Sequence, residues 1–238
     1  MQWLVSVRNR QEADLVMPYG VDRLDLKEPT KGSLGAASPE DWKETVERWH
    51  RQVPVSIALG ELVELDALCD IPHHTDSVKI GLANCGSLAD WPERLNQFFQ
   101  QLPDNVGRVA VYYADRHLAC SPSFNEVLHA ACRLNCQTFL IDTFDKSAGH
   151  LFDHLSITQL KEWRNQLNLA GLHFALAGSL RTSHLSAVGE ICPDIVAVRG
   201  AVCHHDRRGE ISAEALNDFH DRWKRVSTCK QRRVVSPG

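Results

Sequence analysis

Short β-rich runs alternate with helix-like segments along the whole chain, and this alternation limits the folds available to it. The strand candidates are residues 2–7, 22–27, 53–58, 76–81, 107–113, 137–142, 172–177 and 194–199. Their starts lie roughly 20 to 35 residues apart, the length of one strand plus one crossover helix. Eight such units without a proline-rich linker predict an α/β protein with a single-domain (β/α)8 TIM-barrel fold. The main competitor is a doubly wound open sheet, but no GxGxxG follows the first strand.

Helix start signals support this division of the chain. Ser38 precedes Pro39 and two acidic residues, Ser123 has Glu126 in capping-box spacing, and Ser156 or Thr158 begins another apolar stripe. We expect residues 1–226 to form the catalytic barrel domain. Residues 227–238 are basic and rich in turn formers, which predicts a mobile C-terminal tail.

Charge and cysteine content exclude several classes of protein. The 238 residues carry 26 basic and 30 acidic side chains, a net charge of −4, which argues against a surface made for nucleic acid. No stretch approaches the roughly 18 apolar residues that cross a bilayer, and the N-terminal run reads as a strand rather than a signal peptide. The eight cysteines form no CxxC pair and are expected to be reduced thiols in a cytoplasmic protein. We expect no metal site, because Cys132 and Cys136 lack zinc-ligand spacing.

Two lysines stand at predicted strand ends, where this fold places its chemistry. Side chains alternate along a strand, so Asp25 and Lys27 share the face opposite Leu24 and Leu26, and Lys79 likewise points away from its apolar neighbours. Desolvation and a second cation both lower a lysine pKa, which leaves neutral amine to attack a carbonyl. From spacing alone, Schiff-base chemistry and phosphate binding remain equally good interpretations of this pair.

Polar residues and glycines mark the ends of the later strands. Asp142 has two interpretations: a functional group that orients a lysine or takes a proton, or a cap of a helix or loop. Lys146 lies four residues after it. Backbone amides and side chains after the seventh and eighth strands are expected to hold a phosphate group; the residues are Gly178, Ser179, Arg199, Gly200 and Ala201. The segment 32–36, with Ser33 and Gly35, reads either as a second anion cradle or as a flexible connection.

These motifs resemble one family over nearly the whole chain. The specific run is LDLKEP followed by KGSLGA (residues 24–29 and 31–36), and weaker matches are VKIGL (78–82), YAD (113–115), DT (142–143), Lys146, LFD (151–153), ALAGS (175–179) and DIVAVRGA (194–201). The chain is similar to (5-formylfuran-3-yl)methyl phosphate synthase, also called 4-(hydroxymethyl)-2-furancarboxaldehyde-phosphate synthase, a TIM-barrel family of methanofuran biosynthesis. The segment 60–65, residues 83–85 and the loop 204–208 depart from the pattern.

The resemblance implies a lyase that condenses two molecules of glyceraldehyde 3-phosphate into a furan aldehyde phosphate, with loss of phosphate and water. By the same resemblance, Lys27 is the Schiff-base lysine and Lys79 the proton-transfer lysine, with Asp25, Asp142 and Lys146 as supporting acid–base groups. It implies no metal or organic cofactor. The expected partner is the small-molecule substrate, not nucleic acid or membrane, and a homo-oligomer is left open. The abundance of Trp, Cys and His indicates a bacterial member with a methanofuran-like one-carbon carrier.

Two alternatives remain from the sequence. A class I aldolase or a sugar-phosphate isomerase would use the same lysine and phosphate pocket. A non-catalytic barrel that binds a sugar phosphate is disfavoured by the presence of Asp25, Lys27, Lys79 and Asp142 together.

Overall fold

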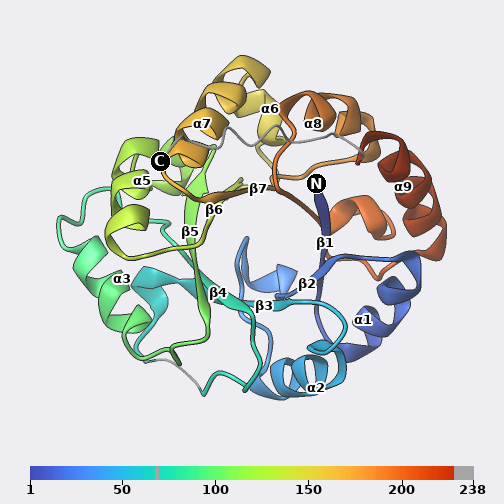
Figure 1. The fold of residues 1–238 in the computed structure, drawn as a ribbon, viewed down its shortest axis with the longest axis horizontal. Helices are drawn as coiled ribbons and strands as arrows, with labels where there is room; N and C mark the ends of the chain where they lie inside the picture. Colours follow the sequence, from blue (N-terminus) through green and yellow to red (C-terminus); the bar gives the residue numbers. More distant parts are fainter. Residues whose placement is uncertain (68–69, 228–238) are drawn as a thin grey trace, which may run out of the picture.

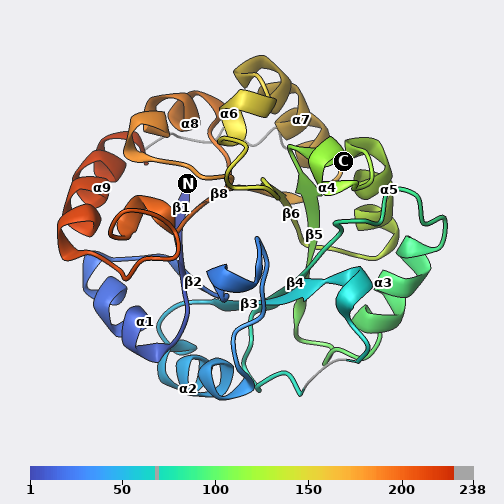
Figure 2. The same ribbon diagram turned by 180° about the vertical axis from the view of Figure 1, so that it is seen from behind.

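Eight parallel strands pair in sequence order and close into a barrel, because β8 also pairs with β1. The computed structural model describes residues 1–67 and 70–227 (Figures 1 and 2). The strands are β1 (Gln2–Val7), β2 (Arg23–Leu26), β3 (Val55–Glu61), β4 (Ser77–Gly81), β5 (Gly107–Tyr113), β6 (Thr138–Asp142), β7 (His173–Leu176) and β8 (Ile195–Val198). The predicted (β/α)8 barrel is confirmed, although β3 runs three residues further than the sequence indicated.

Helices surround the barrel and cover the outer face of its sheet (Figure 1). They are α1 (Arg10–Val16), α2 (Pro39–Trp49), α3 (Trp91–Phe99), α4 (Arg116–Ala119), α5 (Phe124–Arg133), α6 (Leu151–His154), α7 (Ile157–Leu169), α8 (Leu185–Ile191) and α9 (Ala213–Val226). The predicted caps Ser38, Ser123 and Ser156 each accept a hydrogen bond from a backbone N–H in the first turn of α2, α5 and α7. Each of these caps therefore satisfies a donor that the helix leaves unpaired.

The connection from β3 to β4 departs from the expected strand–helix alternation. Among its described residues it contains one short 3-10 turn, Leu62–Glu64, and no α-helix. Only 15 residues separate Glu61 from Ser77. That length is close to the shortest crossover between parallel strands, which leaves little room for a helix with its two connecting turns. The predicted tail, apart from Ser227, lies outside the described residues.

The alternation predicted for β2 and β4 is confirmed by two separate apolar layers. Leu24, Leu26, Val78 and Ile80 belong to the large cluster between the sheet and the helices. A smaller cluster fills the barrel interior from the other faces of the strands; it contains Leu4, Ala58, Val109, Val111, Tyr113, Leu140, Ala175, Ala177 and Ile195. Asp25 and Lys79 share this interior face, so the barrel itself removes them from water.

The segment after β2 closes the C-terminal end of the barrel, which we call the mouth. It begins with a 3-10 turn, Pro29–Lys31, and lies inside the ring of strands in Figures 1 and 2. Leu34, only 1% exposed, joins the interior cluster, and its carbonyl accepts the Gly60 N–H at 2.9 Å. A Cβ at Gly35 would overlap the carbonyl oxygen of Glu28, so the tight return of this segment requires glycine there.

Candidate active site

A buried ion pair occupies the barrel interior below the mouth. The Asp25 carboxylate lies 2.6 Å from Lys79 Nζ and accepts hydrogen bonds from Ser56 Oγ at 2.8 Å and Ser6 Oγ at 3.1 Å. Burial alone would raise the pKa of Asp25, but the charges of Lys79 and Lys27 and these hydrogen bonds lower it. Asp25 is therefore a fixed anion that holds Lys79 Nζ in place.

Lys27 lies one inward position above Asp25, immediately after the last residue of β2. Its N–H continues the strand ladder by bonding to Val7 O, which directs its side chain to the barrel axis. The side chain is 8% exposed, and no described residue lies close enough to pair with its amine. Burial lowers the pKa of Lys27 to about 7; the anions Asp142 and Asp25 oppose this, and the cations Arg207 and Lys146 add to it. A large share of this amine is thus neutral near pH 7.

Asp142 and Lys146 form a second ion pair at the mouth. Lys146 Nζ lies 2.5 Å from Asp142 Oδ1 and also donates to the carbonyl and hydroxyl of Thr143. Burial would raise the pKa of Asp142, but the charges of Lys146 and Lys27 and the Thr143 N–H lower it to about 2. Ser33 Oγ donates to Thr143 O at 2.8 Å and lies 3.3 Å from Asp142 Oδ2. The predicted residues Asp25, Lys27, Lys79, Asp142 and Lys146 are therefore brought together around one centre.

Arg199 is not placed as the sequence predicted. All five of its N–H groups are used by the protein: two bond to Glu12 at 2.7 and 3.1 Å, and the others bond to the carbonyls of Ser6, Arg207 and Gly209. A guanidinium with no spare donor has nothing to offer a phosphate group. Arg199 instead ties the loop after β8 to the N-terminal helix α1 through Glu12, as a positioning residue.

The cation that faces the mouth is Arg207, which the sequence analysis left in an unassigned loop. One of its terminal nitrogens donates to Gly32 O at 2.8 Å and lies 3.5 Å from Ser33 O, so it bridges the loop after β8 to the segment after β2. Its charge acts on Asp142, Lys27 and Lys146, which places it beside the site. In the sequence, Arg207 could have been noticed as part of the basic pair Arg207 and Arg208. This pair follows the last strand and has no alternating apolar residues beside it.

The glycine-containing turns after β7 and β8 hold the residues predicted to bind phosphate. Within the described residues, the backbone N–H groups of Gly178, Ser179, Gly200 and Ala201 donate to no carbonyl or side chain. Amides without partners at adjacent strand ends suit a phosphate group. The other predicted ligands, Ser33 and Gly35, lie in the segment that closes the mouth.

Glu61 and Tyr113 form a buried pair on the β3–β5 side of the mouth that the sequence analysis did not assign. Tyr113 Oη donates to Glu61 Oε1 at 2.5 Å, and Ala83 N–H donates to Oε2 at 2.9 Å. Burial raises the pKa of Glu61, although both hydrogen bonds oppose the shift. The shift in β3–β4 register between Ala58 and Glu61 turns this side chain inward, and such a bulge is not visible in the residue pattern.

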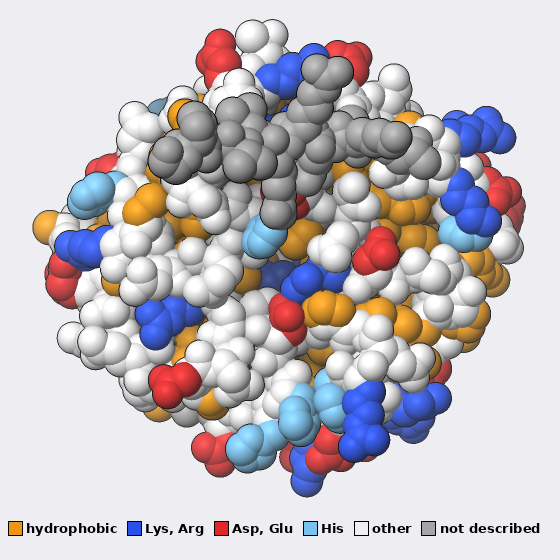
Figure 3. Space-filling view, viewed as in Figure 1, with side chains coloured by type: hydrophobic (Ala, Val, Ile, Leu, Met, Phe, Trp, Pro, Cys, Tyr) orange, Lys and Arg blue, Asp and Glu red, His pale blue; other side chains and the backbone are white. Residues whose placement is uncertain are grey.

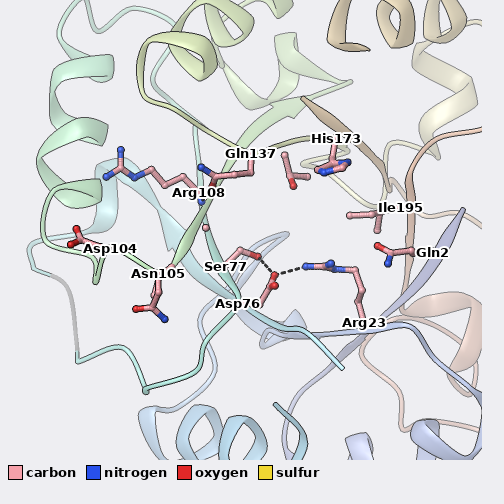
Figure 4. A pocket seen from close by; sticks show the side chains of 13 residues that line it. Gln2, Arg23, Asp76, Ser77, Asp104, Asn105, Arg108, Gln137, His173 and Ile195 are labelled. Carbon is pink, nitrogen blue, oxygen red and sulfur yellow. Dashed lines mark hydrogen bonds and ion pairs between the residues drawn. The ribbon is translucent and has the colours of Figure 1, made fainter. Parts of the chain in front are cut away.

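A hollow of about 470 Å³ lies at the other end of the barrel, where the strands begin. Figure 3 shows charged side chains gathered near the centre of this face, and Figure 4 shows Arg23, Asp76 and Ser77 linked across the hollow. None of the five grouped ionisable residues lines it. In barrels of this kind the chemistry occupies the opposite end, so we assign this hollow no part in catalysis.

Two features are absent from residues 1–67 and 70–227. No three His, Cys, Asp or Glu side chains in these ranges gather as a metal site would require. No helix in the same ranges combines the length and the apolar character needed to traverse a bilayer.

Comparison with known proteins gives one family. The family model described as 4-HFC-P synthase matches residues 3–220. (5-Formylfuran-3-yl)methyl phosphate synthase from Methanococcus maripaludis strain C6 is 33% identical over 239 residues, covering 96% of this chain and 99% of that protein. The protein of the same name from Methanosarcina acetivorans is 31% identical, covering 91% and 96%.

Two solved structures of other enzymes are similar in fold. Phosphoribosyl anthranilate isomerase from Thermotoga maritima superposes with a TM-score of 0.62 at 15% identity, covering 94% of this chain and 98% of that one. 3-Hexulose-6-phosphate synthase from Salmonella typhimurium gives a TM-score of 0.56 at 14% identity, covering 94% and 99%. Likeness at this identity supports the barrel fold alone.

Proposed function

The chain belongs to the 4-HFC-P synthase family, and from this we propose that it condenses two molecules of glyceraldehyde 3-phosphate into (5-formylfuran-3-yl)methyl phosphate. The reaction would be a lyase reaction that proceeds through a Schiff base and releases inorganic phosphate and water. It requires an amine that is neutral at working pH, groups that move protons on carbon, and a site that holds phosphate.

The state of Lys27 is the observation that carries this proposal. Its amine is buried, unpaired among the described residues and has a pKa of about 7. We propose that it attacks the aldehyde of the first triose phosphate, and loss of water then gives an imine. The imine makes the neighbouring C–H acidic, and Lys79 or an aspartate, such as Asp25 at 2.6 Å from Lys79, removes that proton. The resulting enamine attacks the second aldehyde, and phosphate elimination, ring closure and dehydration follow.

Phosphate binding is assigned to the β7 and β8 side of the mouth. The amides of Gly178, Ser179, Gly200 and Ala201 have no partner among the described residues, which leaves their donors open to phosphate oxygens. Arg207 supplies the nearby cation in place of Arg199, whose donors are all used. Asp142 and Lys146 form a charged pair. The Asp142 charge raises the pKa of Lys27, and the Lys146 charge lowers it.

Product analysis tests the reaction. The purified protein is incubated with glyceraldehyde 3-phosphate alone, and the products are followed by ultraviolet absorbance, phosphate assay and mass spectrometry. We expect a furan chromophore that grows together with inorganic phosphate. An aldolase or isomerase acting on the same substrate would yield neither, and that result would refute the proposed reaction.

Borohydride trapping tests the residue roles. Reduction in the presence of the triose phosphate is expected to add mass to Lys27, and an adduct on another residue would refute the nucleophile assignment. Lys79→Ala is expected to form the first adduct but to turn over very slowly, so full activity would remove Lys79 from the mechanism. A bacterial source and a cytoplasmic location stay predictions, since the relatives compared above are archaeal.

A further inference from the structure

Removal of water from a sugar-derived intermediate requires an acid, because hydroxide is a poor leaving group from carbon. This requirement rests on the proposed function. The two aspartates of the site do not meet it: Asp25 is paired with Lys79 and Asp142 with Lys146, and both have lowered pKa values. The site therefore has anions in place but needs a carboxyl group that holds a proton more readily than these two aspartates.

Glu61 is a buried carboxyl in the mouth with no cationic partner among the described residues; Asp115, also buried without one, is occupied by the Phe144 and Asp145 amides. Its two hydrogen-bond donors are the neutral Tyr113 hydroxyl and the Ala83 amide. Burial raises the pKa of Glu61, and the charges of Glu64 and Asp142 act in the same direction. The pKa of Tyr113 lies well above its usual value, chiefly through burial and the Glu61 charge, so its hydroxyl remains a donor. The surroundings of Glu61 thus raise its pKa, whereas those of Asp25 and Asp142 lower theirs.

The position of Glu61 brings it to the same chamber as the lysines. A Cβ at Gly81 would overlap the Glu61 carboxylate, so this carboxylate fills the inward space that a side chain at position 81 would take. Gly81 follows Lys79 by two residues on β4, which puts the two inward positions roughly 7 Å apart along the strand. Tyr113 pairs in register with Asp142 on the neighbouring strand, so it reaches the chamber from the other side.

We propose that Glu61, held by Tyr113 and the Ala83 amide, is the general acid that protonates the leaving hydroxyl when the condensed intermediate loses water. The proton of Glu61 passes to the hydroxyl oxygen as its C–O bond breaks, and the bonding electron pair goes to that oxygen. The Asp25–Lys79 pair takes the proton from the adjacent carbon, whose C–H electron pair forms the C=C bond. Water leaves, and the proton held by that pair returns to the Glu61 carboxylate through exchange with solvent.

Glu61→Gln separates this role from the first step. Glutamine has the same size and can accept from the Ala83 N–H while donating to the Tyr113 oxygen, but it has no acidic proton. We expect wild-type yield of the reduced Lys27 adduct, furan formation slower by on the order of 10²–10⁴-fold, and accumulation of a condensed six-carbon species that keeps its hydroxyl groups. The matched control is Glu47→Gln, an exposed residue of α2 remote from Glu61, which should behave as wild type.

The outcomes distinguish this inference from the proposed function. Absence of furan and of Lys27 adduct in the wild-type protein would refute the proposed function itself. A wild-type protein that makes furan, combined with a Glu61→Gln variant within about threefold of its rate, would refute the role of Glu61 alone. Loss of adduct and furan together in a folded variant would also refute it. Tyr113→Phe provides a second test if Glu61→Gln does not fold: we expect an intact adduct and slower furan formation, and an unchanged rate would count against the pair.

Discussion

Replacing Lys27 by methionine should make the protein more stable, because the folded state carries a penalty for burying this amine. The pKa of Lys27 falls from 10.5 to about 7 on folding. At 1.36 kcal/mol per pKa unit, this difference corresponds to about 5 kcal/mol, an order-of-magnitude figure. Methionine is unbranched and apolar, so it can occupy the space of the lysine stem without the charge.

The penalty has a defined pH dependence. Below pH 7 the amine is charged in both states, and the folded protein bears the full cost. Between pH 7 and 10.5 the folded protein has released the proton that the unfolded chain still holds, so the stability of the wild type rises with pH. The advantage of Lys27→Met should therefore shrink by about 2 kcal/mol between about pH 7 and about pH 9.

Denaturant unfolding of both proteins at these two pH values measures the effect. Lys43→Met is the matched control, because the Lys43 side chain is exposed and the difference from wild type should be equal at both pH values. An equal stability difference between wild type and Lys27→Met at both pH values would show that the Lys27 amine is charged in the folded protein at either pH. That result would refute Lys27 as a neutral nucleophile.

Three further changes test separate features of the site. Arg207→Ala should raise KM for the triose phosphate on the order of tenfold in steady-state assays, since one charge-assisted phosphate contact is lost; an unchanged KM would remove Arg207 from the phosphate site. Gly81→Ala should displace the Glu61 carboxylate, and we expect a folded protein by circular dichroism with furan formation slowed on the order of 10²-fold; wild-type rates would contradict the placement of that carboxylate. Alkylation followed by mass spectrometry should modify the exposed Cys120 before Cys85, because burial raises the pKa of Cys85 to about 12; the reverse order would contradict the burial.

The residue pattern was sufficient for the barrel and for the lysines. Strand alternation places Asp25, Lys27 and Lys79 on the interior face whatever the details of the loops, because side chains alternate with a period of two. The caps Ser38, Ser123 and Ser156 are likewise local signals, since each acts on the backbone two or three residues away. These predictions depend only on short-range geometry.

Arg199 and Arg207 show where such reasoning stops. Both arginines follow β8: Arg199 directly precedes Gly200, and Arg207 lies six residues beyond Ala201. Their roles are decided by Glu12, 187 residues away in the chain, which occupies Arg199 and leaves the mouth to Arg207. Glu61 is a similar case, because a bulge in β3 decides whether its side chain faces the chamber or the helices. Long-range pairing and backbone irregularity leave no periodic trace in a single sequence.

The absence of an ion-pair partner sets Lys27 and Glu61 apart from the other charged groups discussed here. Burial penalises every charge in the mouth, and the penalty is met by pairing for Asp25 with Lys79 and for Asp142 with Lys146. Among the described residues, Lys27 and Glu61 are buried without an ion pair, and burial shifts the pKa of each toward its neutral form. In the proposed mechanism, the same barrel interior thus provides a nucleophile and an acid from groups of opposite charge type. Supplying either with an ion partner, for example by Ala83→Lys beside Glu61, should restore its charged form and suppress its chemistry.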